Sequence, residues 1–155
     1  MNIDDQRRIT LRFLAEPSEV NFGGNVHGGT VMKWIDEAAY TCAARWSGKY
    51  CVTVYVGGIR FLHPIHIGHL VEVQAQIIYT GRSSMHIAVD VMAGDPKRPG
   101  LHLTTHCIIV FVAVDEDRKP VAVPKWVPQS TADQMLEAHA LKLIALRNDI
   151  DEEMR

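Results

Sequence analysis

Polar and apolar side chains alternate at two different periods along this chain, and each period predicts one kind of secondary structure. Alternation at every second position, which is typical of half-buried strands, covers residues 8–14, 69–79 and 85–91. In the second of these segments one face carries five apolar side chains, namely Val71, Val73, Ala75, Ile77 and Tyr79. The three segments are therefore predicted to be strands with one face against a core.

Two further segments predict strands by composition. Residues 51–56 are rich in β-branched residues, and Gly57 and Gly58 follow where a bulge or kink would interrupt the strand. Residues 101–114 are long and apolar enough for a central strand. Stretches rich in turn-forming or charged residues separate the segments and predict turns or loops at 80–83, 94–100 and 115–120.

One long helix is predicted near the start of the chain. Residues 28–47 follow a glycine-rich loop, and Gly48 stands where it could terminate the helix. Most side chains between Val31 and Trp46 are apolar. A helix that is apolar nearly all round is usually buried, so we expect this one to be buried.

The segment 130–153 predicts an amphipathic terminal helix, with a capping box at Thr131 and Gln134. Leu136, Leu143 and Ile150 lie seven residues apart and form a narrow apolar seam. We expect another copy, in an assembly larger than a dimer, to cover this seam, and the alternative is the sheet of the same chain.

The predicted elements follow the order strand, long buried helix, four or five antiparallel strands, terminal helix. A single buried helix before an antiparallel meander predicts a sheet wrapped around that helix, which is an α+β arrangement. The 155 residues are enough for one domain with a substantial core.

One carboxylate stands out within the first predicted helix. Asp36 lies among apolar side chains and beside the polar stripe formed by Lys33, Glu37, Thr41 and Arg45. A carboxylate on an apolar surface must be paired, protonated or used in function. Spacing alone leaves three possibilities open, which are an ion pair with Lys33, partial exposure, and a role in chemistry.

Charge and hydropathy exclude several classes of function. A net charge of −2 and a pI near 6.4 give no basic surface for nucleic acid. No apolar run reaches the roughly 18 residues of a membrane span. The charged first residues lack the apolar core of a signal peptide, so we expect a cytoplasmic protein.

The cysteines and histidines do not predict a metal site. Cys42, Cys51 and Cys107 are odd in number, lie in apolar stretches, and predict buried free thiols in a reducing compartment. His102 and His106 are four residues apart, but they lie in a predicted strand without the glutamate of a zinc-binding helix. We therefore expect no metal.

Several short motifs, in this order, resemble the hotdog-fold acyl-coenzyme A thioesterases. The first runs from Asn21 through His27-Gly28-Gly29 to Ile35-Asp36 and resembles the active-site loop and helix of that family. The remaining motifs are Phe61…Pro64…Gly68, Gly81-Arg82-Ser83-Ser84, and Val112-Ala113-Val114-Asp115 followed by Pro124. The resemblance implies a hotdog domain at residues 1–125, with 126–155 as a C-terminal helical extension.

The resemblance also implies an activity, the hydrolysis of acyl-coenzyme A to free acid and coenzyme A. Four residues would be catalytic: Asn21, Gly28, Gly29 and Asp36. Six would bind substrate or coenzyme A: His27, Arg60, Gly81, Arg82, Ser83 and Ser84. His27 departs from the family pattern, in which many members carry an aromatic residue, and this bears on acyl-chain preference. Coenzyme A is part of the substrate and product, and no other cofactor is implied.

Residue chemistry agrees with these roles. Backbone N–H groups at a helix N-terminus suit a developing oxyanion, and glycines allow close approach of a substrate oxygen. Asp36 could attack the thioester as a nucleophile or activate a water as a general base. Asn21 could bind a water or the carbonyl, or could serve only as an Asx-turn residue.

Helix geometry adds a prediction about assembly. Asp36 lies about two turns, or roughly 12 Å, along the predicted helix from Gly28. That separation is too long for both residues to act on one carbonyl carbon. Two antiparallel helices across a dimer axis would place Asp36 of one chain beside Asn21 and Gly28 of the other. The resemblance implies the same composite site, and beyond it a trimer of dimers.

Two other functions compete with hydrolysis. The resemblance to a hotdog enoyl-coenzyme A hydratase would require a histidine five residues after the aspartate. This chain has Thr41 at that position, which argues against a hydratase. A non-catalytic acyl-coenzyme A sensor would need an output domain, whereas the only additional segment is one terminal helix. We therefore expect a thioesterase.

Overall fold

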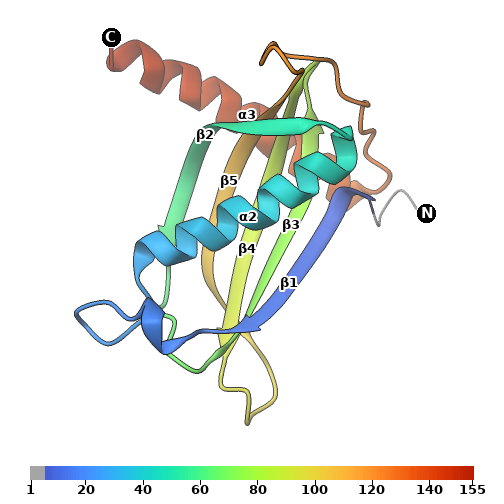
Figure 1. The fold of residues 1–155 in the computed structure, drawn as a ribbon. Helices are drawn as coiled ribbons and strands as arrows, with labels where there is room; N and C mark the ends of the chain where they lie inside the picture. The colour runs from blue at the N-terminus through green and yellow to red at the C-terminus, as the bar shows by residue number, and fades with distance from the viewer. Residues whose placement is uncertain (1–5) are drawn as a thin grey trace.

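The computed structural model describes residues 6–155, which form one antiparallel sheet with a helix on each face (Figure 1). The sheet has five strands in the order β1-β3-β4-β5-β2, so β1 and β2 are its edges. The strands are β1 (Arg8–Leu14), β2 (Tyr50–Phe61), β3 (Leu70–Thr80), β4 (Ser84–Gly94) and β5 (His102–Val114). The predicted α+β order of elements is confirmed.

Helix α2 (Gly28–Ser47) lies across one face of the sheet and has the predicted bounds. Gly48 ends it in the left-handed region, with φ 67°, and donates its N–H to the Ala44 carbonyl. The helix buries one side, which includes Trp34, Ile35 and Ala39, against the main core. The predicted burial of this helix is confirmed on the side that faces the sheet, whereas the opposite side, with Asp36, is exposed to solvent in the single chain.

Strand β2 shows the irregularity that its glycines predict. Its pairing with β5 shifts register between Thr53 and Tyr55, and again between Gly57 and Arg60. Gly58 has φ 62°, a conformation that side chains other than glycine rarely adopt. The predicted interruption at Gly57-Gly58 is confirmed.

Strand β3 contains a bulge that its alternation did not predict. The pairing with β4 shifts between Ile77 and Tyr79. Ile77 therefore points into the main core, while Ile78 and Tyr79 both lie in the second cluster on the other face. Placing Tyr79 on the same face as Val71 and Val73 is wrong, because the extra residue reverses the order of faces.

Helix α3 (Thr131–Glu153) covers the opposite face of the sheet from α2 (Figure 1). The N-cap residue is Ser130, whose hydroxyl accepts the Asp133 N–H at 3.1 Å, so the predicted cap at Thr131 and Gln134 is wrong. Leu136 and Leu143, with Ala140 of the same helix, pack against Ile78, Ala88 and Ile108 of the chain's own sheet. For these residues the covering surface is therefore the chain's own sheet and not another copy. Ile150, the third member of the predicted seam, is 53% exposed.

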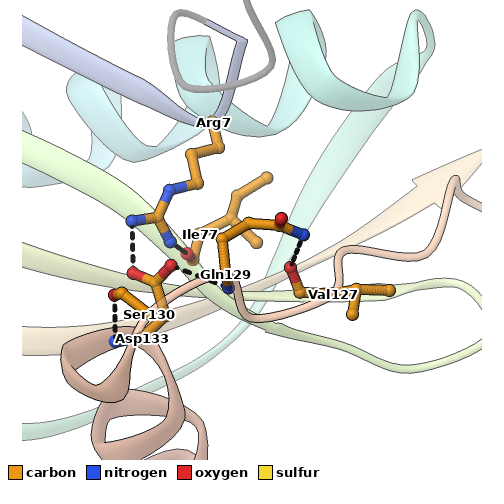
Figure 2. Close-up of polar contacts among 6 residues, drawn as sticks. All are labelled: Arg7, Ile77, Val127, Gln129, Ser130 and Asp133. Carbon is orange, nitrogen blue, oxygen red and sulfur yellow. Dashed lines mark hydrogen bonds and ion pairs between the residues drawn. The ribbon is translucent and has the colours of Figure 1, made fainter.

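A buried ion pair fixes the start of α3 to the first strand (Figure 2). Arg7 donates to an Asp133 carboxylate oxygen at 2.7 Å and to the Ile77 carbonyl at 3.3 Å. Its guanidinium also lies 4.6 Å from the centre of the Trp126 ring, and Trp126 belongs to the main core. The other Asp133 oxygen accepts the Gln129 N–H. The chain between β5 and α3 is therefore packed against the sheet.

The three cysteines are buried free thiols, as predicted. Burial raises the pKa of Cys42 to about 12 and that of Cys107 to about 11, so both thiols are protonated and unreactive at neutral pH.

Candidate active site

Asn21 is held at its carbonyl end and leaves its amide group available. The side-chain Oδ1 accepts the N–H of Gly23 at 2.9 Å and that of Asn25 at 3.0 Å. Asn21 is therefore a loop-forming residue, as one interpretation of the sequence held. Among residues 6–155, no acceptor bonds the Nδ2 amide, so the same residue can also donate to a substrate.

The two glycines at the start of α2 differ in what their N–H groups do. His27 is the N-cap residue, and its Nδ1 accepts the Gly29 N–H at 3.2 Å. Its carbonyl accepts from Thr30 and Val31. The Gly28 N–H donates to no group among the described residues. Of the two predicted oxyanion donors, Gly28 is therefore the available one, and His27 acts as a helix cap.

Asn21 and Gly28 line one open pocket of about 310 Å³. Its walls come from the loop before α2, from Phe61 at the end of β2 and from Thr105 on β5. The Thr105 hydroxyl is fully buried and has no hydrogen-bond partner in the described part of the chain. We call Asn21, Gly28 and this pocket the donor half-site.

Asp36 is exposed on α2 and accepts a hydrogen bond from the Thr53 hydroxyl of β2 at 2.8 Å. Lys33 pairs with Glu37 instead, at 3.9 Å. Partial exposure, one of the three possibilities left open by the sequence, is therefore what the single chain shows. We call Asp36 and Thr53 the carboxylate half-site.

The sequence interpretation missed Thr53. Its signal is weak, since the residue is one of several β-branched residues in a strand, and its partner lies 17 positions earlier. Only the placement of edge strand β2 beside the exposed side of α2 brings the two together.

A single chain does not bring the two half-sites together. Eight residues of helix, roughly 12 Å, separate Gly28 from Asp36. The residues of β2 that belong to the two half-sites are also far apart, because Thr53 and Phe61 lie near opposite ends of this strand.

The Gly81–Ser84 turn joins β3 to β4 and is rigidly held. Gly81 donates to the Ser84 carbonyl at 3.0 Å, and a side chain at Gly81 would collide with the Ser84 hydroxyl. The Arg82 and Ser83 carbonyls accept from Val123 and Ala113. Arg82 itself is exposed. The turn therefore presents one guanidinium from a fixed backbone.

Arg60 does not join this turn within one chain. It pairs with His106 across β2 and β5, whereas Ser84 pairs with Val112, six residues along β5. That places Arg60 roughly 20 Å from the turn along the strand direction. Arg60 directly precedes Phe61, which lines the donor half-site, but Arg60 is not itself among the residues that line that pocket.

Among residues 6–155 there is no group of three or more histidine, cysteine or acidic side chains that could hold a metal ion. No helix in the same range is long and apolar enough to cross a membrane.

Comparison with known sequences identifies the family. The Thioesterase superfamily profile matches residues 23–99. Protein VdlD of Helicobacter pylori is 32% identical over 143 residues, which cover 92% of this chain and 82% of that protein. The chain belongs to the thioesterase superfamily. Acyl-CoA thioester hydrolase YciA of Salmonella typhimurium is 31% identical over 128 residues, which cover 80% of this chain and 96% of that protein.

Solved structures of this superfamily have the same fold. Acyl-CoA hydrolase from Bacillus cereus superposes with a TM-score of 0.90 at 25% identity, covering 97% of this chain and 92% of that one. A hexameric acyl-CoA thioesterase gives 0.91 at 28% identity, covering 96% and 95%. The hotdog fold predicted from the motifs is confirmed.

One relative carries informative substitutions. Acyl-CoA hydrolase from Staphylococcus aureus, solved with butyryl coenzyme A and coenzyme A, has a TM-score of 0.89 at 26% identity, covering 97% of this chain and 92% of that one. Alanine variants of that enzyme replace an asparagine, an aspartate 15 positions later and a threonine a further 17 positions on. The same spacings separate Asn21, Asp36 and Thr53.

Proposed function

We propose that this chain hydrolyses acyl-coenzyme A to free acid and coenzyme A, in a homodimer with two composite active sites. The observation that carries the proposal is the division of the site into two complementary half-sites on one chain. The donor half-site has N–H groups that donate to no acceptor in the described part of the chain, and the carboxylate half-site has an exposed carboxylate. The superfamily membership and the names of the relatives support the same reaction.

In this proposal the donor half-site stabilises the oxyanion. When a thioester carbonyl is attacked, negative charge develops on its oxygen, and donors already in place lower the energy of that state. The Gly28 N–H lies at the positive end of the α2 dipole. The Asn21 Nδ2 is the second donor, because its carbonyl end is already fixed by the loop.

Asp36 supplies the attacking group by one of two routes. As a general base it takes a proton from water, the water oxygen bonds to the acyl carbon, and the carbon–sulfur bond breaks to release coenzyme A thiolate. As a nucleophile it first forms an acyl anhydride, which water then hydrolyses. In both routes the Thr53 hydroxyl holds one carboxylate oxygen, so the other is directed away from β2.

The exposed edge of the sheet supports the proposed dimer. Strand β2 has one unpaired side, and it exposes Tyr50 (54%), Val54 (53%) and Phe61 (54%). Such an edge is a template for pairing with another strand. A second copy related by a two-fold axis would run its α2 antiparallel to the first and place each Asp36 near the partner's donor half-site.

Larger assembly and substrate recognition complete the proposal. Hexameric relatives support a trimer of dimers.

The Arg82 guanidinium, with the Ser83 and Ser84 hydroxyls, would bind phosphate of the coenzyme A nucleotide. His27 and Arg60 are the sequence neighbours of Gly28 and Phe61, which line the donor half-site, and we propose that they contact the substrate's acyl or pantetheine part. Buried free thiols fit the cytoplasmic location that we keep as part of the proposal.

Thiol release from a panel of acyl-coenzyme A substrates tests the function. We expect turnover by the native chain and a fall in kcat of about 10³-fold for Asp36→Ala. Glu37→Ala is the matched control, since it removes the adjacent exposed carboxylate of the same helix. Substrate binding without turnover would instead indicate a sensor. A change in enoyl absorbance without thiol release would indicate a hydratase.

A further inference from the structure

A second cavity lies on the other face of the sheet from the half-sites, beneath the C-terminal half of α3. We call it the α3 groove. Its volume is about 190 Å³, and most of the residues that line it are apolar. They include Ile108 and Val110 of β5 together with Leu143, Leu146 and Ile150 of α3. No part of the proposed hydrolytic mechanism uses this space.

His86 gives the groove a polar side chain. The residue is only 4% exposed, lines the cavity, and forms no hydrogen bond with any residue in the described range. Burial, with the nearby Arg147 charge, lowers its pKa to about 4, so the imidazole is neutral at pH 7. A neutral imidazole carries one N–H donor. The ring packs edge-to-face on Tyr79, with 5.1 Å between the ring centroids, and its N–H is available to a ligand in the groove.

Arg147 places a positive charge at the same groove. Its guanidinium lies 5.1 Å from the centre of the Tyr55 ring, and no carboxylate pairs with it among residues 6–155. A side chain at position 57 would overlap the Tyr55 ring. Gly57 therefore leaves space for the Tyr55 ring that Arg147 contacts. No acidic residue lines the groove. The polar groups of the cavity are therefore suited to an anion.

We propose that the α3 groove binds a monocarboxylate with an apolar body. Its carboxylate would pair with Arg147 and accept the His86 N–H, while its body would pack on Val110 and Leu143. The size agrees, because an apolar cavity of about 150 Å³ holds benzene, and the groove is somewhat larger and open at one side.

Calorimetric titration of the full chain with octanoate, and with 1-octanol as the uncharged match, tests this proposal. We expect octanoate to bind, and Arg147→Gln to weaken its binding by about tenfold or more while octanol binding changes little. Lys142→Gln is the control, since it removes an exposed positive charge of the same helix that lies outside the groove. Leu146→Trp should fill the groove and weaken both ligands.

Imidazole NMR signals locate the bound octanoate. Octanoate should move the His86 signals in the native chain, and it should still do so in Asn21→Ala, whose change lies at the donor half-site. Sedimentation and circular dichroism of each variant check that fold and assembly are kept. The proposal is wrong if octanoate does not bind at millimolar concentration or if Arg147→Gln binds it as tightly as the native chain. It is also wrong if the His86 signals follow protein concentration instead of octanoate, which would mean that a second copy fills the groove.

Discussion

At the scale of single residues, the hydrogen bonds already present decide which groups can meet a substrate. Gly29 is occupied by His27, whereas Gly28 is available. Asn21 is fixed through its oxygen and is available through its nitrogen. The Arg82 side chain is exposed on a turn in which the Arg82 and Ser83 carbonyls already accept hydrogen bonds. Each of these residues therefore has one group left for binding or catalysis, and this limits the role that each can have.

Arg82→Ala should raise KM for acyl-coenzyme A by about tenfold while kcat changes little. The reason is that a phosphate contact remote from the carbonyl contributes similar binding energy to the ground state and the transition state. Steady-state kinetics with acyl-coenzyme A and with the matching acyl-pantetheine, which lacks the nucleotide, measure this. An equal loss on both substrates would show that Arg82 does not bind the nucleotide.

The identity of most site residues could be predicted from motifs, but their surroundings could not. The loop from Asn21 to Asp36 is contiguous, so its motif carries its own spacing. The Asp36–Thr53 contact depends on how an edge strand lies beside a helix, which no local pattern encodes. Likewise, the apolar residues around Asp36 did not reveal that this side of the helix is exposed in the single chain.

At the scale of elements, periodicity predicted β1 and α2 to the residue, and it failed where a bulge changed the period. Strand β3 turns its faces over between Ile77 and Tyr79, a local feature that alternation cannot reveal. The apolar seam of α3 did not indicate by itself which surface covers it, because a row of apolar residues can pack on another copy or on the chain's own sheet. Leu136 and Leu143 contact the chain's own sheet, and the buried Arg7–Asp133 pair fixes the helix start there.

Asp133→Asn should lower the free energy of unfolding by about 3 kcal/mol at pH 7, because it removes the carboxylate charge from a buried ion pair. Burial alone would raise the Asp133 pKa, but the Gln129 N–H and the Arg7 guanidinium together lower it below its ordinary value. The carboxylate therefore contributes stability above about pH 4, and this contribution is lost as pH falls through the lowered pKa.

Denaturant unfolding at several pH values measures this effect. The difference between the native chain and Asp133→Asn should shrink as the pH is taken below about 4. Asp149→Asn, an exposed carboxylate of the same helix, is the control and should change stability little. A difference that is independent of pH would show that the ion pair does not account for the docking of α3.

At the scale of the whole molecule, the single chain exposes two surfaces that the proposed dimer would cover, the β2 edge and the exposed side of α2. Val54→Asp should convert the dimer to a monomer, since a charge on an exposed edge strand opposes strand pairing. Met135→Asp is the control, because that residue is 70% exposed on α3, away from the β2 edge. Sedimentation measures the outcome. A dimer that persists in Val54→Asp would place the interface elsewhere.

The composite site makes a further prediction, which tests the central claim most directly. Asn21→Ala and Asp36→Ala should each be nearly inactive alone, because each damages one half-site of every pair. After the two variants are mixed and exchange subunits, each heterodimer should regain one site with both half-sites intact. Thiol release should then recover toward half the native activity per heterodimer. Heterodimers demonstrated by mass spectrometry that show no recovery would contradict the account, since the two residues would then have to serve one site within a single chain.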